Sequence, residues 1–101
     1  MAKPVMDEKT EYLFKGILSL KTVEECRAFF EDLCTIKEVT EMSRRLAAAQ
    51  MLKEGLVYTT IAEETGLSTA TICRVNRALK YGSDGYETVL RRLSEEPEDG
   101  K

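Results

Sequence analysis

Three basic side chains recur at regular spacing at the end of the stretch TIAEETGLSTATICRVNRAL (residues 60–79) and just beyond it. Arg74, Arg77 and Lys80 are each three residues apart, and no Asp or Glu occurs from residue 65 to 83. The chain as a whole has a formal net charge of −3, so this basic, acid-free segment is a local feature. Unopposed cations on one segment are typical of a surface that binds phosphates, as a nucleic-acid-binding surface does.

The sequence offers little for catalysis or for metal binding. It has no histidine and no glycine-rich phosphate loop, and its carboxylates lie mainly where first turns of helices are expected. Cys26, Cys34 and Cys73 fit neither a zinc motif nor a disulfide framework, and we interpret them as small apolar residues. We therefore expect no enzyme, no cofactor and no metal.

Length and composition predict one small domain. The 101 residues are 43% hydrophobic and 33% charged, which suits one compact unit over residues 1–93. In residues 94–101, four acids and one lysine account for the whole net charge, and Pro97 and Gly100 favour a disordered acidic tail. No run of 18 apolar residues and no secretory leader occurs, so we expect a cytoplasmic protein without a membrane span.

Apolar residues recur at helical spacing in six segments, and no segment predicts a strand. The expected fold class is therefore all-α. Capping residues and glycines predict the helix boundaries. These are a first helix from about Asp7 to Leu20, a second opened by Thr22 with Glu25, a third and longest opened by Thr35 with Glu38 and closed by Gly55, a pair within residues 58–80, and a last helix opened by Asp84 with Glu87.

Residues 58–80 have the pattern of a helix-turn-helix. Two short helices that cross steeply need a small residue where they approach, here Ala62, and a glycine in the turn, here Gly66. Ser68 is placed to cap the second helix. Four apolar residues occupy the expected buried positions, namely Ile61, Leu67, Ile72 and Val75. The inward face of the second helix is completed by Leu79, and its outward face comprises Thr69, Ala70, Cys73, Arg74 and Arg77.

This outward face suits the major groove of DNA. Small and hydroxyl side chains at the start of a helix enter the groove without a clash, and arginines further along reach bases and phosphates. We therefore expect a sequence-specific transcriptional regulator, more specifically a repressor, that uses the helix from about Thr69 to Lys80. The alternative is a helical protein-interaction module, adaptor or antitoxin-like, that uses the same helix pair. Salt dependence separates the two, because binding through phosphates weakens steeply with salt.

The segment TGLSTATICRVNRALK resembles the Trp-repressor superfamily, and more closely its YerC/YecD-like group of bacterial proteins. The A-T-I-x-R core matches, and upstream Thr35, Arg45 and Gly55 fall in register. One residue is missing between Gly55 and Gly66 relative to the Trp repressor. The resemblance implies an all-helical homodimer with interlocked N-terminal helices that binds a palindromic operator. The apolar Phe14, Leu18, Phe29, Phe30 and Leu33 also favour a covering subunit.

The resemblance also assigns the DNA-facing positions. They fall on Ser68, Thr69, Ala70, Thr71 and Cys73, with Arg74 and Arg77 beyond. Basic residues of the family's first motif helix align with Thr59 and Ala62 here, so the operator should differ. We include Thr59 and Lys80 in the candidate DNA-binding set. Cys73 is either a redox sensor or a passive small side chain, and nothing beyond Arg74 marks its thiol as activated.

An effector site is implied by the resemblance but altered in this chain. In the Trp repressor, tryptophan lies between two arginines that align with Arg45 and Arg74, over a glycine that aligns with Val75. A serine near the ligand's amino group aligns with Ala78, and Thr35 completes the candidate pocket. A valine adds three carbons where the indole needs space. We interpret Val75 as a core residue, with a remodelled pocket for another effector as the alternative, and expect tryptophan not to bind.

Overall fold

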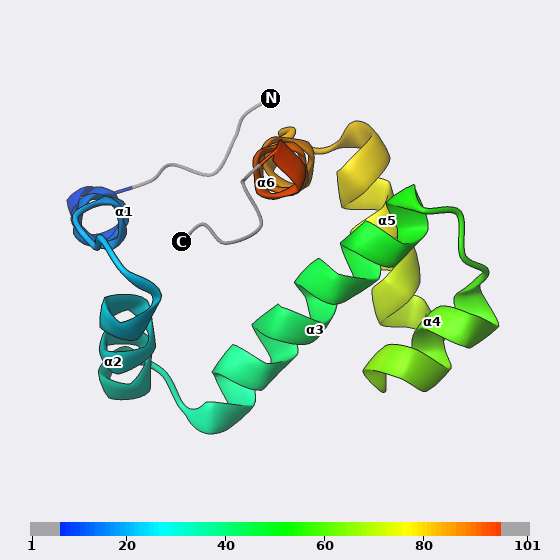
Figure 1. Ribbon diagram of the computed structural model, residues 1–101, viewed down its shortest axis with the longest axis horizontal. Helices are drawn as coiled ribbons and strands as arrows, with labels where there is room; N and C mark the ends of the chain where they lie inside the picture. Colours follow the sequence, from blue (N-terminus) through cyan, green and yellow to red (C-terminus); the bar gives the residue numbers. More distant parts are fainter. Residues whose placement is uncertain (1–6, 96–101) are drawn as a thin grey trace. The chain divides into compact units, whose positions relative to one another are not determined.

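The computed structural model describes residues 7–95, which form six helices and no strand (Figure 1). This confirms the predicted all-α class. None of the helices in that range is both long and apolar enough to cross a membrane. The helices are α1 (Glu8–Leu18), α2 (Val23–Leu33), α3 (Ile36–Lys53), α4 (Tyr58–Thr65), α5 (Thr69–Tyr81) and α6 (Gly85–Glu95).

The chain divides after Val39 into two compact units, residues 1–39 and 40–101. The boundary falls within α3, the longest helix, as the sequence predicts for its third segment. The predicted single domain over residues 1–93 stays a prediction. Most of the predicted acidic tail, residues 96–101, lies outside the described residues.

Local caps open the helices of the N-terminal unit. The carboxylate of Asp7 accepts a hydrogen bond from the backbone N–H of Thr10 at 2.9 Å, and the hydroxyl of Thr22 accepts from the N–H of Glu25 at 3.0 Å. At the start of α3, the hydroxyl of Thr35 accepts from the N–H of Glu38 at 3.1 Å, and the Glu38 carboxylate accepts from the N–H of Thr35 at 2.8 Å. This reciprocal pair is the predicted capping box.

The end of α3 depends on Gly55. Its φ of 87° lies in the left-handed region, which costs a glycine little. Its N–H donates to the carbonyl of Leu52 at 3.0 Å, and the N–H of Leu56 donates to that of Met51 at 3.1 Å. These two bonds form the Schellman motif that satisfies carbonyls at a helix end. The predicted stop at Gly55 is confirmed.

Two small cores lie on α3, at its consecutive alanines Ala48 and Ala49. Both alanines are fully buried, and their lack of bulk lets other helices approach closely. One core joins Ala48 to Ile61, Leu67 and Ile72, and the other joins Ala49 to Val75 and Leu90. Figure 1 shows α4 and α5 beside the C-terminal half of α3. All four predicted core residues of residues 58–80 are buried.

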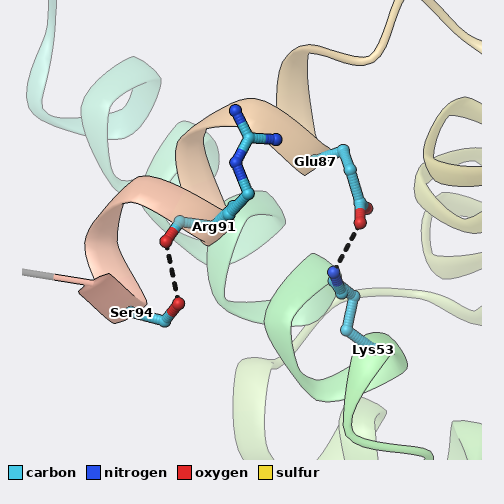
Figure 2. A network of polar contacts seen from close by, with 4 residues as sticks. All are labelled: Lys53, Glu87, Arg91 and Ser94. Atoms are coloured by element: carbon cyan, nitrogen blue, oxygen red, sulfur yellow. Dashed lines mark hydrogen bonds and ion pairs between the residues drawn. The ribbon is translucent and has the colours of Figure 1, made fainter.

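The predicted cap of the last helix is wrong. Asp84 does precede α6, but its φ of 67° is left-handed, whereas a residue that caps a helix start is extended. Glu87, the supposed second half of that cap, instead pairs with Lys53 of α3, with 2.6 Å between Oε2 and Nζ (Figure 2). The sequence prediction considered only residues next to Glu87, whereas the side chain that binds it, Lys53, lies 34 positions earlier in the chain.

Candidate nucleic-acid interface

The helix-turn-helix is built on the core around Ala48. Ile61 of α4 and Ile72 of α5 are fully buried, and Leu67 in the turn is 5% exposed. Burying side chains of this size stabilises a fold by about 1.5 to 3 kcal/mol each, which is large relative to the stability of a small domain. The orientation of α5 is therefore set by its inward face, and its outward face is held in place.

The turn between α4 and α5 has its own hydrogen bonds. Gly66, with φ 78°, ends α4 and donates its N–H to the carbonyl of Ala62 at 2.8 Å. The hydroxyl of Thr65 donates to the carbonyl of Ile61 at 2.7 Å and accepts from the N–H of Leu67 at 3.2 Å. Thr65 is the one buried polar residue among those described. Sequence reasoning missed this role, for which a threonine directly before the turn glycine is the only signal.

Ser68 caps α5, as predicted. Its Oγ accepts from the N–H of Thr71 at 3.1 Å and donates to the Thr71 hydroxyl, also at 3.1 Å. The hydroxyl of Thr71 is thus engaged in the cap, and this residue is half-buried. Thr69 and Ala70 are exposed, so they form the tip of the helix.

The outward face of α5 is a continuous exposed stripe. At 100° per residue its members fall within an arc of about 140°, opposite the buried Ile72 and Val75. Among the residues that the structure describes, none of the basic side chains in this stripe forms an ion pair. The exposed candidates are Thr69, Ala70, Cys73, Arg74, Arg77 and Lys80, and Thr59 is exposed on α4.

A shallow depression of about 580 Å³ joins the end of α5 to the start of α4. It brings the thiol-bearing Cys73 and two of the basic residues into one hollow with aromatic and amide groups. Its lining mixes charged and amide groups with aromatic rings, and the two cations suit an anionic partner. It is lined by Tyr58, Cys73, Asn76, Arg77, Lys80 and Tyr81.

The start of α4 lacks the side-chain cap that opens α5. Its N-cap residue, Val57, makes no side-chain hydrogen bond to the helix, and its first turn contains no acid. The first backbone N–H groups of a helix have no intrahelical partner, and the helix dipole adds partial positive charge there. This end therefore favours an anion, and it adjoins the depression through Tyr58. Sequence reasoning named Thr59 here but missed the uncapped backbone.

The candidate effector residues are not alike in their surroundings. Val75 is 2% exposed and packs with Ala49 and Leu90, so its side chain is part of the core. Arg45 and Ala78 are half-buried, and Arg74 is exposed. Thr35 lies in the other unit, and its hydroxyl and N–H both serve the capping box of α3. The burial of Val75 supports its interpretation as a core residue.

All three cysteines are free thiols. Cys26 and Cys73 are exposed and Cys34 is half-buried, so none of them is a fully buried core residue. Cys73 lies on the outward stripe of α5, where its small side chain lets a binding partner approach the helix closely. Its predicted role as a passive small side chain stays a prediction.

The chain matches known proteins over nearly its whole length. The family model described as Trp repressor protein matches residues 8–94. The uncharacterized Bacillus subtilis protein YerC is 53% identical over 88 residues, which cover 87% of this chain and 85% of YerC. A crystal structure of a TrpR-like protein from Eubacterium eligens superposes with a TM-score of 0.85 at 53% identity, covering 88% of this chain and 92% of that one. A candidate Trp repressor from Staphylococcus aureus gives 0.84 at 47% identity, with 89% and 90% coverage.

Proposed function

Because the chain belongs to the Trp repressor family, we propose that it is a DNA-binding transcriptional regulator that reads the major groove with α5. The observation that carries this proposal is the outward stripe of α5, which is exposed, free of acids and fixed by a buried inward face. A recognition helix needs these three properties, because it must reach the base edges without meeting the phosphates with negative charge.

The tip of α5 supplies the base contacts in this proposal. Thr69, Ala70 and Cys73 are small and exposed, so the helix start can approach the base edges closely. The Thr69 hydroxyl can donate to or accept from a base, and Ala70 offers an apolar contact to a thymine methyl group. Ser68 and Thr71 contribute chiefly by capping the helix that carries these residues.

Phosphate contacts come from both helices of the motif. Arg74, Arg77 and Lys80 are exposed and unpaired among the described residues, and Arg77 and Lys80 line the depression that reaches Tyr58. The uncapped N–H groups at the start of α4 suit a phosphate oxygen. Together they would hold α5 in register on the duplex, while the tip determines sequence preference.

The experiment is a titration of the full chain against a duplex that it selects from a random-sequence pool, and against a scrambled duplex, at about 50 and 200 mM salt. Arg77→Ala should weaken binding to both duplexes and lower the salt slope by about one for each phosphate that the variant no longer binds. Thr69→Val should change the preferred bases with little change in slope. Arg92→Ala, at an exposed position on α6, removes the same single charge elsewhere and is the matched control for Arg77→Ala. Alanine at both Arg91 and Arg92 is the matched control for the variant with alanine at both Arg74 and Arg77.

Affinity that is unchanged when both Arg74 and Arg77 are alanine would contradict the proposal. Salt-insensitive capture of a protein partner by the same helix pair would favour the alternative, a helical interaction module.

Genomic DNA recovered after crosslinking would give the operator and the regulated genes. We propose repression as the sign of regulation, and increased transcription of those genes on deletion of the protein tests it. Such a regulator acts where the chromosome lies, in the bacterial cytoplasm.

We also propose that the protein is a homodimer on a palindromic operator. Neither α1 nor α2 has a buried residue, although Tyr12, Leu18 and Val23 are large, apolar and mostly exposed. Between these two helices lies a largely apolar hollow of about 630 Å³, with Leu13, Phe29 and other apolar residues in its lining. A second subunit would cover this surface and place two α5 helices on successive major grooves, about 34 Å apart.

Tryptophan is not the corepressor in this proposal. Val75 aligns with the glycine under the indole in the Trp repressor, and its side chain packs in the core with Ala49 and Leu90. Ala78 lacks a hydroxyl for the ligand's amino group. Millimolar L-tryptophan should therefore change neither the thermal melting temperature nor the DNA affinity. A ligand that binds only the folded state must raise that temperature in a saturable way. A rise of several degrees that Arg45→Ala abolishes would refute this part of the proposal and reopen the pocket.

A further inference from the structure

Arg44 of α3 lies over the turn of the helix-turn-helix, far from that motif in sequence. A Cβ built on Gly66 would lie 3.8 Å from Nη1 of Arg44 and 3.9 Å from its Cζ, both of them guanidinium atoms. These are ordinary van der Waals contact distances, so the guanidinium of Arg44 lies directly beside the turn at Gly66.

The core explains why Arg44 reaches this position. Residues four apart share one face of a helix, so Arg44 lies one turn before Ala48 on the same face of α3. Ala48 packs against Ile61, Leu67 and Ile72, which lie in α4, the turn and α5. The face of α3 that carries Arg44 is therefore fixed against the motif, and the long arginine side chain extends past the core toward the turn.

The charge of Arg44 is not neutralised within the described part of the chain. There, the one ion pair joins Lys53 to Glu87, and the Arg44 guanidinium donates no hydrogen bond. Glu41 precedes it by one turn of α3, and Glu63 and Glu64 lie near the end of α4, yet none of these carboxylates is within 4.0 Å of it. Arg44 is exposed, so a cation is presented to solvent beside the start of α5.

We propose that Arg44 binds a DNA phosphate at the rim of the groove that α5 enters, an inference that rests on the proposed function. The first residues of a recognition helix reach the bases, so the turn that precedes them lies close to one phosphate strand. Arg44 is beside that turn, whereas Arg77 and Lys80 lie more than two helical turns further along α5. The reading helix is then held by phosphate contacts at both ends, one of them supplied from outside the motif.

A purely structural role for Arg44 makes a different prediction. If its guanidinium only packs on the turn, its removal lowers thermal stability and weakens binding to every duplex through the fold, with no specific phosphate involved. If it binds phosphate, its removal lowers the number of ions released on binding, and one position on the DNA backbone accounts for the loss.

The experiment compares Arg44→Gln, Arg44→Lys and Arg77→Ala with the wild-type chain on a duplex that the wild-type chain selects. Arg92→Gln on α6 is the matched control for the change in charge. Arg44→Gln should weaken binding about tenfold or more and lower the salt slope by about 0.9 for each phosphate that is no longer neutralised. Arg44→Lys should keep most of the slope, because a lysine retains the point charge but loses the planar fork. Arg92→Gln should change neither.

Duplexes with a single neutral methylphosphonate then identify the phosphate. At one position, next to the bases read by the tip of α5, the wild-type chain should lose as much affinity as Arg44→Gln does, and the two changes together should cost no more than either alone. The corresponding position for Arg77→Ala should differ.

Full additivity of Arg44→Gln with every methylphosphonate would overturn the inference, as would a wild-type salt slope in Arg44→Gln. If Arg44→Gln also lowers the melting temperature, Arg44→Lys decides, because a reduced slope in that variant contradicts a charge-based interaction. If Arg77→Ala still weakens binding and lowers the salt slope while Arg44→Gln gives one of these two results, only the interaction of Arg44 with phosphate is refuted. Salt-independent binding by the wild-type chain refutes the proposed function instead.

Discussion

The two units of the chain differ in how many side chains they bury. Every buried side chain among the described residues belongs to the second unit, from Ala48 in α3 to Leu90 in α6. In the first unit, α1 and α2 bury none. The helix-turn-helix therefore has its own core, whereas the N-terminal helices have caps and exposed apolar faces.

This difference separates two sources of helix stability. Isolated helices of 11 residues, the length of α1 and of α2, are marginal in water, and most helical stability comes from packing an apolar face. Asp7 and Thr22 satisfy backbone groups at the helix starts, but they bury no apolar surface. We infer that the first unit needs a second subunit for its packing and that the second unit does not.

The largest effect is expected in the core of the second unit. Ile72→Ala removes a fully buried side chain that packs with Ala48, Ile61 and Leu67, and should lower the free energy of unfolding by about 2 to 5 kcal/mol. Chemical denaturation measures it. Leu18→Ala, a truncation at a residue that is 84% exposed in the chain alone, is the comparison. Its effect should depend on protein concentration and vanish at high dilution, and an equal, concentration-independent loss would contradict the distinction.

A charge on the N-terminal helices should disrupt assembly and leave the second unit folded. Leu18→Glu places a carboxylate in the face that the second subunit is expected to cover, where its desolvation is unfavourable. Sedimentation at low micromolar concentration should change from dimer to monomer, while the melting signal of the helix-turn-helix persists. Glu8→Gln, an exposed change in the first turn of α1, is the control. A wild-type chain that sediments only as a monomer would refute the dimer.

Local patterns predicted most of the fold. Thr35 with Glu38, Ser68 with Thr71, and Gly66 act across at most four positions, so the residues themselves specify the helix ends. The four core positions of the motif followed from the residue offsets of a helix-turn-helix, which depend only on the spacing of apolar residues around the turn glycine. For the same reason the outward stripe of α5 could be predicted from the sequence.

Interactions over long sequence separation were beyond such patterns. Glu87 looked like a capping residue because only its neighbours were considered, but α3 brings Lys53 to it. Arg44 gave no signal of its proximity to Gly66, since that depends on how α3 crosses the motif. The uncapped start of α4 at Val57 was missed because a missing hydrogen bond leaves no motif in the sequence.

The ion pair between α3 and α6 should contribute little, although it joins distant parts of the second unit (Figure 2). The side chains of Lys53 and Glu87 are 37% and 46% exposed, so water screens their attraction. A double-mutant cycle with Lys53→Met and Glu87→Gln should give a coupling energy of about 0.2 to 1 kcal/mol, lower still at high salt. A coupling of several kcal/mol would mean that this polar pair, rather than the apolar core, joins α6 to α3.

The smallest effect concerns the pH dependence of α1, whose stability in the chain alone depends on its cap. Hydrogen bonds from the N–H and hydroxyl of Thr10 hold the pKa of the Asp7 carboxyl below its ordinary value of 3.8. Because the folded-state pKa is the lower one, this contribution to stability is present above pH 3.8 and is lost as the pH falls through the folded-state pKa. Carbon-13 titration of Asp7 should give a midpoint below 3.8, and the helical signal of α1 should fall over the same range.

Asp7→Asn is the control, because it keeps a side-chain cap that does not titrate. The loss of helical signal that follows Asp7 should disappear in that variant, while α1 remains helical at neutral pH. A midpoint at or above 3.8 would mean that the negative charge of Asp7 adds nothing to the cap of α1.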